Sequence, residues 1–178
     1  EVQRLVSIVS LRLAHPDGRI LVQLAKVNES AGPEIKLEPV CQLPGTKLKP
    51  GETAADAIQR MLHEEFLPLA PGLQLGDAMT EDVSILTSRR YRLMTRYATK
   101  VQPATLANEY EMPALACVTT TRNTVARTSS TSAAYEEMLQ RQALGSVRLL
   151  SDGRSTMVYT FLTTEEFARL SSDKGRQM

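Results

Sequence analysis

A charged helix behind a loop rich in Pro and Gly, residues 44–68, constrains this chain more than any other segment. Two Pro-Gly pairs break regular structure in the loop, and residues 54–66 then hold good helix formers until Pro68 ends the run. Thr53 followed three residues later by Asp56 predicts a capping box at the helix start. The segment therefore predicts one loop-helix unit with a defined start and a defined end.

Two faces of this helix are expected to have different roles. One face carries apolar residues spaced by four, which predicts a stripe buried against a sheet. Positions 61, 64 and 65 make another face, because residues three and four apart are neighbours on a helix. Two carboxylates on that face offer the oxygen ligands that a divalent cation bound to a pyrophosphate needs. The buried stripe is Ile58, Leu62 and Phe66, and the acidic pair is Glu64 and Glu65.

Two further charged residues flank the acidic pair. Glu52 precedes the helix, where it either complements the helix dipole or reaches the acidic pair. Arg60 either pairs with Glu64, four residues later, or with Glu52. Both alternatives place Arg60 where it orients a carboxylate.

The order Gly45-Thr46, Gly51-Glu52, Arg60 and Glu64-Glu65 resembles the signature of the Nudix superfamily. That signature runs Gly, five residues, Glu, seven residues, then Arg-Glu-aliphatic-any-Glu-Glu-any-Gly. The resemblance implies an α/β fold, an α/β/α sandwich with a mixed central sheet. It implies Mg²⁺- or Mn²⁺-dependent cleavage of a nucleoside diphosphate linked to another group. It also implies catalytic roles for Glu52, Arg60, Glu64 and Glu65, and a metal site formed by Glu64, Glu65 and the Gly45 carbonyl.

Three positions depart from the Nudix signature. Thr46 stands at its first Gly, Met61 at the Glu after the Arg, and Leu67 at its last Gly. The thioether of Met61 neither carries charge for a metal nor accepts a proton from water. Either another carboxylate serves, or turnover falls. Later candidates, among which the sequence does not choose, are Glu109, Glu111, Glu136 and Glu137.

Two classes of function stay open at this point. The first is a metal-dependent phosphoanhydride hydrolase that binds a nucleotide or a nucleoside-diphosphate ligand. The second is a non-catalytic module that keeps the fold as a nucleotide sensor, or as a structural or interaction piece of a larger protein or a ribonucleoprotein assembly with RNA. Met61 and Leu67 favour the second class.

A cationic strand face is a further candidate ligand site. Alternation along residues 90–101 places Arg90, Arg92 and Arg96 on one side, where they bind phosphates or RNA or form a solvated face. Lys47, in the loop before the helix, is a fourth candidate for contact with the ligand.

The remaining patterns predict a single domain, residues 1–178, with a mixed or antiparallel sheet and a mobile loop insertion at residues 119–132. Hairpins are expected at residues 5–13 with 20–27 and at 147–150 with 157–162. Other strands are expected at 39–43, 83–86, 90–101 and 113–118, and further helices at 133–144 and 164–170.

Composition excludes several classes of protein. A net charge of +1 excludes a strongly basic nucleic-acid binder, and two cysteines are too few for a disulfide scaffold or a zinc module. Eight aromatic residues without Trp disfavour sequence-specific recognition of single strands. The longest mostly apolar stretch, residues 5–14, is far shorter than the roughly 20 residues of a membrane span. We therefore expect a soluble, intracellular protein, in an organelle or outside one.

Overall fold

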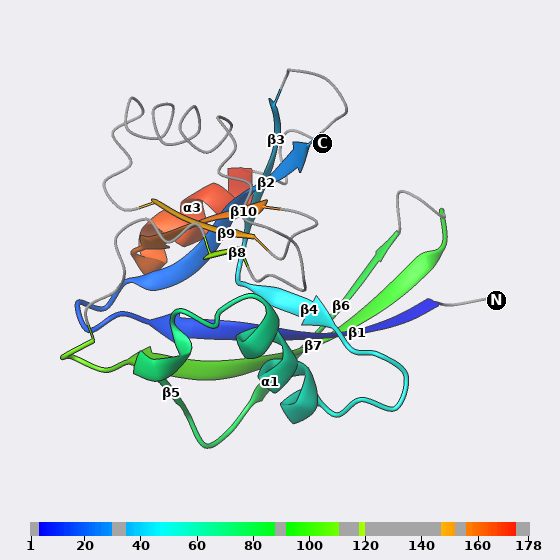
Figure 1. The fold of residues 1–178 in the computed structure, drawn as a ribbon. Coiled ribbons are helices and arrows are strands. Elements are labelled where there is room, and N and C mark those ends of the chain that lie inside the picture. The colour runs from blue at the N-terminus through cyan, green and yellow to red at the C-terminus, as the bar shows by residue number, and fades with distance from the viewer. Residues whose placement is uncertain are drawn as a thin grey trace.

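A computed structural model describes residues 4–29, 35–87, 92–110, 118–119, 147–151 and 156–173 (Figure 1). Ten strands and two α-helices lie in this part of the chain. The strands are β1 (Arg4–Ala14), β2 (Ile20–Glu29), β3 (Ile35–Gln42), β4 (Gly45–Lys47), β5 (Leu73–Leu75), β6 (Thr80–Thr87), β7 (Met94–Leu106), β8 (Val118–Thr119), β9 (Val147–Ser151) and β10 (Thr156–Leu162). The helices are α1 (Ala54–Glu64) and α3 (Thr164–Asp173), with a short 3-10 turn η1 (Ala70–Gly72).

The sheet consists of two halves joined by the first hairpin. β1 lies between β7, which is parallel to it, and β4, which is antiparallel. β2 lies between β3 and β10, both antiparallel to it. β1 and β2 themselves pair where Ala14 meets Ile20. The sheet is therefore mixed, as expected, and the β1–β2 hairpin carries the chain from one half to the other.

The core lies between α1 and the sheet. The stripe of Ile58, Leu62 and Phe66 is buried there, which confirms the prediction, and Phe66 meets Tyr159 of β10 edge to face with ring centroids 5.3 Å apart. Burial of such side chains contributes about 1.5–3 kcal/mol each. The cluster consists of Val9, Leu11, Leu13, Leu21, Ala57, Ile58, Met61, Leu62, Phe66, Leu69, Ala104, Leu106, Tyr159 and Phe161.

Both faces of β10 are buried. Tyr159 and Phe161 point into the cluster under α1, and the alternate residues Val158 and Thr160 are buried outside it. The second helix, α3, contacts β3 and β10. A mixed sheet with two helices is thus the architecture expected from the sequence. No helix among the described residues is long and apolar enough to cross a membrane.

Several element boundaries differ from those predicted. β3 begins at Ile35 instead of residue 39, β6 covers Thr80–Thr87 instead of 83–86, and β7 covers Met94–Leu106 instead of 90–101. β4 and β5 were not predicted at all, because three-residue strands have no periodicity to detect. The predicted helix at 133–144, and almost all of the predicted strand at 113–118 and loop at 119–132, lie outside the described residues.

Candidate functional site

The start of α1 is fixed by the predicted capping box. The Thr53 hydroxyl accepts a hydrogen bond from the Asp56 backbone N–H at 3.2 Å, and the Asp56 carboxylate accepts one from the Thr53 backbone N–H at 3.1 Å. Two N–H groups that the helix leaves without partners are satisfied in this way. The cap sets the direction in which α1 leaves the loop and so where its later charged residues lie.

Glu52 and Arg60 form an ion pair that joins the loop to α1, and we call this pair the lock. Arg60 donates from Nε to Oε1 of Glu52 at 2.7 Å and from Nη2 to Oε2 at 3.0 Å. Both side chains are largely buried, with 18% of Arg60 and 11% of Glu52 exposed. A bidentate guanidinium-carboxylate pair is among the stronger polar contacts in proteins, because both charges and both hydrogen bonds act together. Of the two pairings predicted for Arg60, the one with Glu52 therefore dominates.

Further contacts close the loop around Arg60. Its Nη2 also donates to the Lys47 backbone carbonyl at 3.1 Å, and its Nη1 to the Thr46 hydroxyl at 3.4 Å. The Lys49 backbone N–H donates to Oε2 of Glu52 at 2.7 Å. These three contacts were missed by sequence reasoning, because two of them are made by backbone atoms and leave no trace in side-chain identity.

The lock changes the acidity of Glu52. Hydrogen bonds from the Arg60 guanidinium, and then from the Lys49 backbone, lower the pKa of Glu52 from 4.5 to about 2. The same pair raises the pKa of Arg60. Glu52 is therefore ionised at neutral pH and already bound, so it is not poised to accept a proton from an attacking water.

Gly45 is required by the close approach of β4 to β1. A Cβ there would lie 2.7 Å from the Ser10 Oγ and 2.9 Å from the Val9 carbonyl oxygen. The Leu11 N–H donates to the Pro44 carbonyl and the Leu48 N–H to the Ser7 carbonyl. Antiparallel alternation then directs the carbonyls of residues 45 and 47 away from β1. The contact of Lys47 with Arg60 agrees with this direction, so the Gly45 carbonyl faces the same side as the lock.

The acidic pair lies at the C-terminal end of α1. Glu64 closes the helix and Glu65 is its C-cap, with its backbone N–H bonded to the Met61 carbonyl. The Glu64 side chain is 41% exposed and its Oε2 is 3.8 Å from Arg60 Nη1, whereas Glu65 is half-buried. Glu64 thus lies on the same side as the loop and the lock.

Met61 does not lie on the acidic face, and that prediction was wrong. Its side chain is fully buried within the core cluster, in the row that also holds Ile58 and Leu62. Within the residues that the structure describes, no three His, Cys, Asp or Glu side chains gather closely enough to hold a metal ion. The donors that the resemblance implies, Glu64, Glu65 and the Gly45 carbonyl, therefore lack the further carboxylate that the signature has at position 61.

The chain resembles solved structures, although no protein-family model and no curated protein matches it. A Nudix hydrolase from Nitrosomonas europaea matches 60% of this chain and 63% of its own length, with 17% identity and a TM-score of 0.36. RenU, from M. smegmatis, matches 64% and 65%, with 19% identity and a TM-score of 0.35. These neighbours are Nudix hydrolases.

A third solved structure is a bifunctional NMN adenylyltransferase/ADP ribose pyrophosphatase from Francisella tularensis, complexed with AMP and a Mn ion. It matches 62% of this chain and 33% of its own, with 18% identity and a TM-score of 0.32. The chain spans less than two thirds of each of these three structures. Identities below 25% and TM-scores below 0.5 decide neither the activity nor the ligand of this chain.

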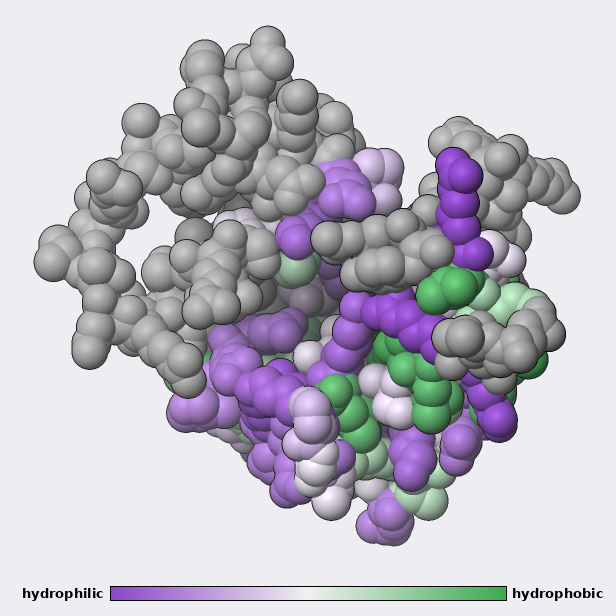
Figure 2. Space-filling model, turned by 90° about the vertical axis from the view of Figure 1, so that its right-hand side faces the viewer, coloured by the Kyte–Doolittle hydropathy of each residue, from purple (hydrophilic) through white to green (hydrophobic). Residues whose placement is uncertain are grey.

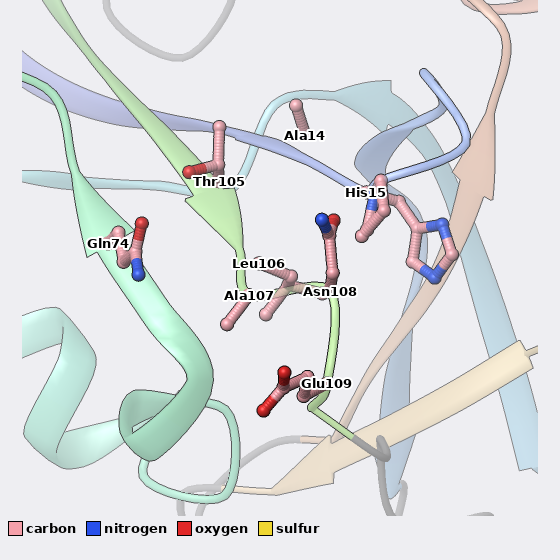
Figure 3. A pocket seen from close by; sticks show the side chains of 9 residues that line it. Ala14, His15, Gln74, Thr105, Leu106, Ala107, Asn108 and Glu109 are labelled. Carbon is pink, nitrogen blue, oxygen red and sulfur yellow. The ribbon is translucent and has the colours of Figure 1, made fainter.

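A pocket of about 560 Å³ opens at the ends of β1, β5 and β7 (Figure 3). None of residues 45–65, which include the lock and the acidic pair, lines it. Polar side chains of Gln74, Thr105, Asn108 and Glu109 surround apolar Leu106 there. The lining contains no Lys or Arg, so it does not suit a phosphate. Glu109, a candidate replacement for the missing carboxylate, lines this pocket, while Glu111, Glu136 and Glu137 lie outside the described residues.

The strand predicted to carry three arginines begins later than expected in the described residues. Arg92 precedes β7 with a φ of 52°, which breaks the alternation, and β7 begins at Met94. Arg96 is exposed on β7, and Arg90 lies outside the described residues. The positive φ turns the chain before the strand starts, so Arg92 and Arg96 do not follow a common period of two.

Proposed function

We propose that this chain is a non-catalytic module with a Nudix-like fold, which serves as a structural or interaction piece of a larger assembly. The burial of Met61 carries the proposal, because the position that the signature gives to a catalytic carboxylate belongs to the core. A carboxylate there would have to be buried among apolar side chains, at a large cost in free energy. The loop-helix unit is kept as framework.

The lock supports this interpretation. Arg60 ties α1 to the loop through four hydrogen bonds, two to Glu52 and one each to Thr46 and Lys47. Such a network stabilises the arrangement of β4, loop and helix without any reaction. The presence of both residues at the spacing of the signature is thus explained by folding alone.

A second candidate function is binding of a metal-diphosphate ligand, such as a nucleoside diphosphate with Mg²⁺ or Mn²⁺, without turnover. The position of Glu64 and Glu65 favours it. Carboxylate oxygens are the ligands that Mg²⁺ and Mn²⁺ prefer in proteins, and the Glu64 side chain is 41% exposed. The Gly45 carbonyl lies on the same side as Glu64 and would add a further oxygen.

Chromatography of the products separates the module from an enzyme, because hydrolysis of phosphoanhydrides yields phosphorylated products, such as AMP and ribose 5-phosphate from ADP-ribose. Wild type and Glu64→Gln are incubated with Mg²⁺ or Mn²⁺ and with ADP-ribose, nucleotide sugars, dinucleoside polyphosphates and 5′-triphosphate RNA. We expect no turnover in either protein, with an active pyrophosphatase as the positive control. Wild-type turnover that Glu64→Gln abolishes would overturn the proposal.

Mn²⁺ titration by electron paramagnetic resonance, with and without ADP, tests the second candidate. Binding that is weakened at least tenfold in Glu64→Gln and Glu65→Gln supports it. Glu165→Gln is the matched control, because Glu165 is exposed in the first turn of α3. Absence of binding in wild type rejects the second candidate and leaves the module as a structural piece.

A further inference from the structure

An exposed edge strand extends from the body of the molecule. β6 pairs antiparallel with β7 from Thr80 with Val101 to Thr87 with Met94, and all eight of its residues are exposed. No strand in the described part of the chain pairs with the other edge of β6. We call the arm β6 together with residues 94–101 of β7 and 4–7 of β1; Figure 1 shows it reaching away from α1. Long exposed edges promote pairing with another strand, because their backbone N–H and C=O groups lack a neighbouring strand.

One face of the arm carries four exposed apolar residues around Arg96, which lies opposite both Ile85 and Leu5. Cross-strand pairing places Val83, Ile85, Met94 and Leu5 on the same face, and it is the face that continues from Val9 and Leu11 under α1. Their exposed fractions are 42%, 55%, 44% and 65%. Figure 2, which looks at this end of the molecule, shows hydrophobic atoms gathered among hydrophilic ones. We call these four residues the arm patch.

The charges near the two ends of β6 differ. Glu81 and Asp82 lie near its start, where Glu81 is opposite Lys100 of β7. β6 itself contains no basic residue, but near its other end Ile85 is opposite Arg96 and Thr87 is opposite Met94, two residues after Arg92. We call the first the acidic end and the second the basic end; Val83, Ser84 and Ile85 lie between them.

We propose that the occupant of this edge is a second copy of the chain, with β6 paired antiparallel to β6 of its partner about a two-fold axis at Ser84. In this register Val83 of each copy lies opposite Ile85 of the other, which joins the two arm patches into one apolar surface. Each acidic end meets the basic end of the other copy. Asp82 lies opposite Leu86 on the other face.

Other arrangements fit the charges less well. A parallel pairing in register would place Glu81 beside its own copy, which is repulsive. In the antiparallel register the two Glu81 residues are six residues apart along the strands, about 20 Å, beyond the roughly 8 Å over which exposed charges interact at physiological salt. A shift of the axis to Val83 would set Glu81 opposite Ile85 and lose both apolar pairs.

Sedimentation velocity over a range of concentrations measures the dimer directly. A single strand pair is smaller than a standard interface of roughly 1,200 Å², so we expect a dimer with a Kd of about 10 μM to 1 mM. Ile85→Lys places a charge at the centre and is expected to raise the Kd at least tenfold. Leu170→Lys, at an exposed apolar residue of α3, is the matched control and should leave the Kd unchanged.

A charge exchange identifies the register. Glu81→Lys alone and Arg92→Glu alone each oppose like charges in a homodimer and should be monomeric where wild type dimerises. Mixed one to one, the two variants restore both opposite-charge contacts and should form a heterodimer, with circular dichroism confirming that each is folded. A wild-type chain that is monomeric up to 1 mM, or a mixture that stays monomeric, overturns the proposal.

Discussion

Arg60 donates two hydrogen bonds to the carboxylate of Glu52, eight residues earlier, at 2.7 and 3.0 Å. Nη1 of the same guanidinium lies 3.8 Å from Oε2 of Glu64. The arginine therefore stands between a loop carboxylate that it binds tightly and a helix carboxylate that it only approaches. This difference assigns Glu52 to the framework and leaves Glu64 with 41% of its side chain exposed.

Replacing Arg60 tests the lock. Arg60→Met keeps the length of the side chain but removes its donors, and we expect a loss of about 1–3 kcal/mol in unfolding free energy, because charged hydrogen bonds to partly buried groups are lost. Arg60→Lys should lie in between, since an ammonium group does not match the carboxylate fork. Urea unfolding measures both. Arg12→Met, at an exposed position on β1, is the control; equal losses in Arg12→Met and Arg60→Met would contradict the assignment.

The lock also predicts how stability depends on pH. The Arg60 guanidinium holds the pKa of Glu52 at about 2, below its ordinary 4.5. A carboxyl with a lower pKa in the folded state stabilises the fold above the unfolded pKa and loses that effect as pH falls through the folded pKa. The difference in Tm between wild type and Glu52→Gln should be constant above pH 5. It should shrink as the pH falls from about 4.5 to about 2. Asp17→Asn serves as a comparison, because Arg19 also lowers the pKa of Asp17.

Substitutions of Met61 test whether this position belongs to the core or to an active site. Met61→Glu places a charge in a fully buried position and is expected to cost about 3 kcal/mol or more in unfolding free energy, with no gain in hydrolysis of phosphoanhydrides. Met61→Leu conserves volume and should cost less than about 1.5 kcal/mol. Urea unfolding of both variants decides between the two readings of this position. A stable Met61→Glu protein would show that the side chain reaches solvent.

The cap of α1 is expected to matter more than that of α3. Thr53→Ala removes one half of the capping box and should lower the unfolding free energy by about 1 kcal/mol. Thr163→Ala removes the corresponding hydroxyl before α3, where the Glu166 N–H donates to it at 3.1 Å. Because most of α3 is exposed, that change should fray the helix and lower the stability of the core less. Thermal unfolding followed by circular dichroism compares them, and equal losses would contradict the difference in packing.

Gly45→Ala should separate β4 from β1. The new methyl would lie 2.7 Å from a side-chain oxygen of Ser10 and 2.9 Å from the Val9 carbonyl, so the strands must move apart. We expect a loss of about 1–3 kcal/mol in urea unfolding. Adding Ser10→Ala should recover only part of it, since the Val9 carbonyl belongs to the main chain. Full recovery in the double variant would place the strain in the hydroxyl alone.

The helix and its cap were predictable because their signals are local. Thr53, Asp56 and the apolar stripe act within one or two turns, and the structure contains all of them where the pattern indicates. Met61 shows the limit of this reasoning. It lies about 60° around the helix axis from Ile58, at the margin between the two faces, and only the packing of the sheet decides which face it joins.

The start of β7 was predicted wrongly for a different reason. Alternation places side chains correctly only inside a strand, and the pattern gives no start for β7. The turn at Arg92 sets that start. Its positive φ could not be predicted, because arginine rarely adopts this backbone conformation. β4 and the Lys47 carbonyl were likewise invisible, because their contacts are made by main-chain atoms.

The pairing of β1 with β7 has a consequence for how the chain is made. Arg4 to Ala14 find their parallel partners at residues 95–105, and β2 finds β10 only at residues 156–162. During synthesis the first hairpin therefore leaves the ribosome long before either neighbour exists, and closing such long loops slows folding. Until Tyr159 and Phe161 arrive, the apolar side of α1 lacks part of its cover. β1 and β2 are therefore paired with all their neighbours only after residues 156–162 have been synthesised.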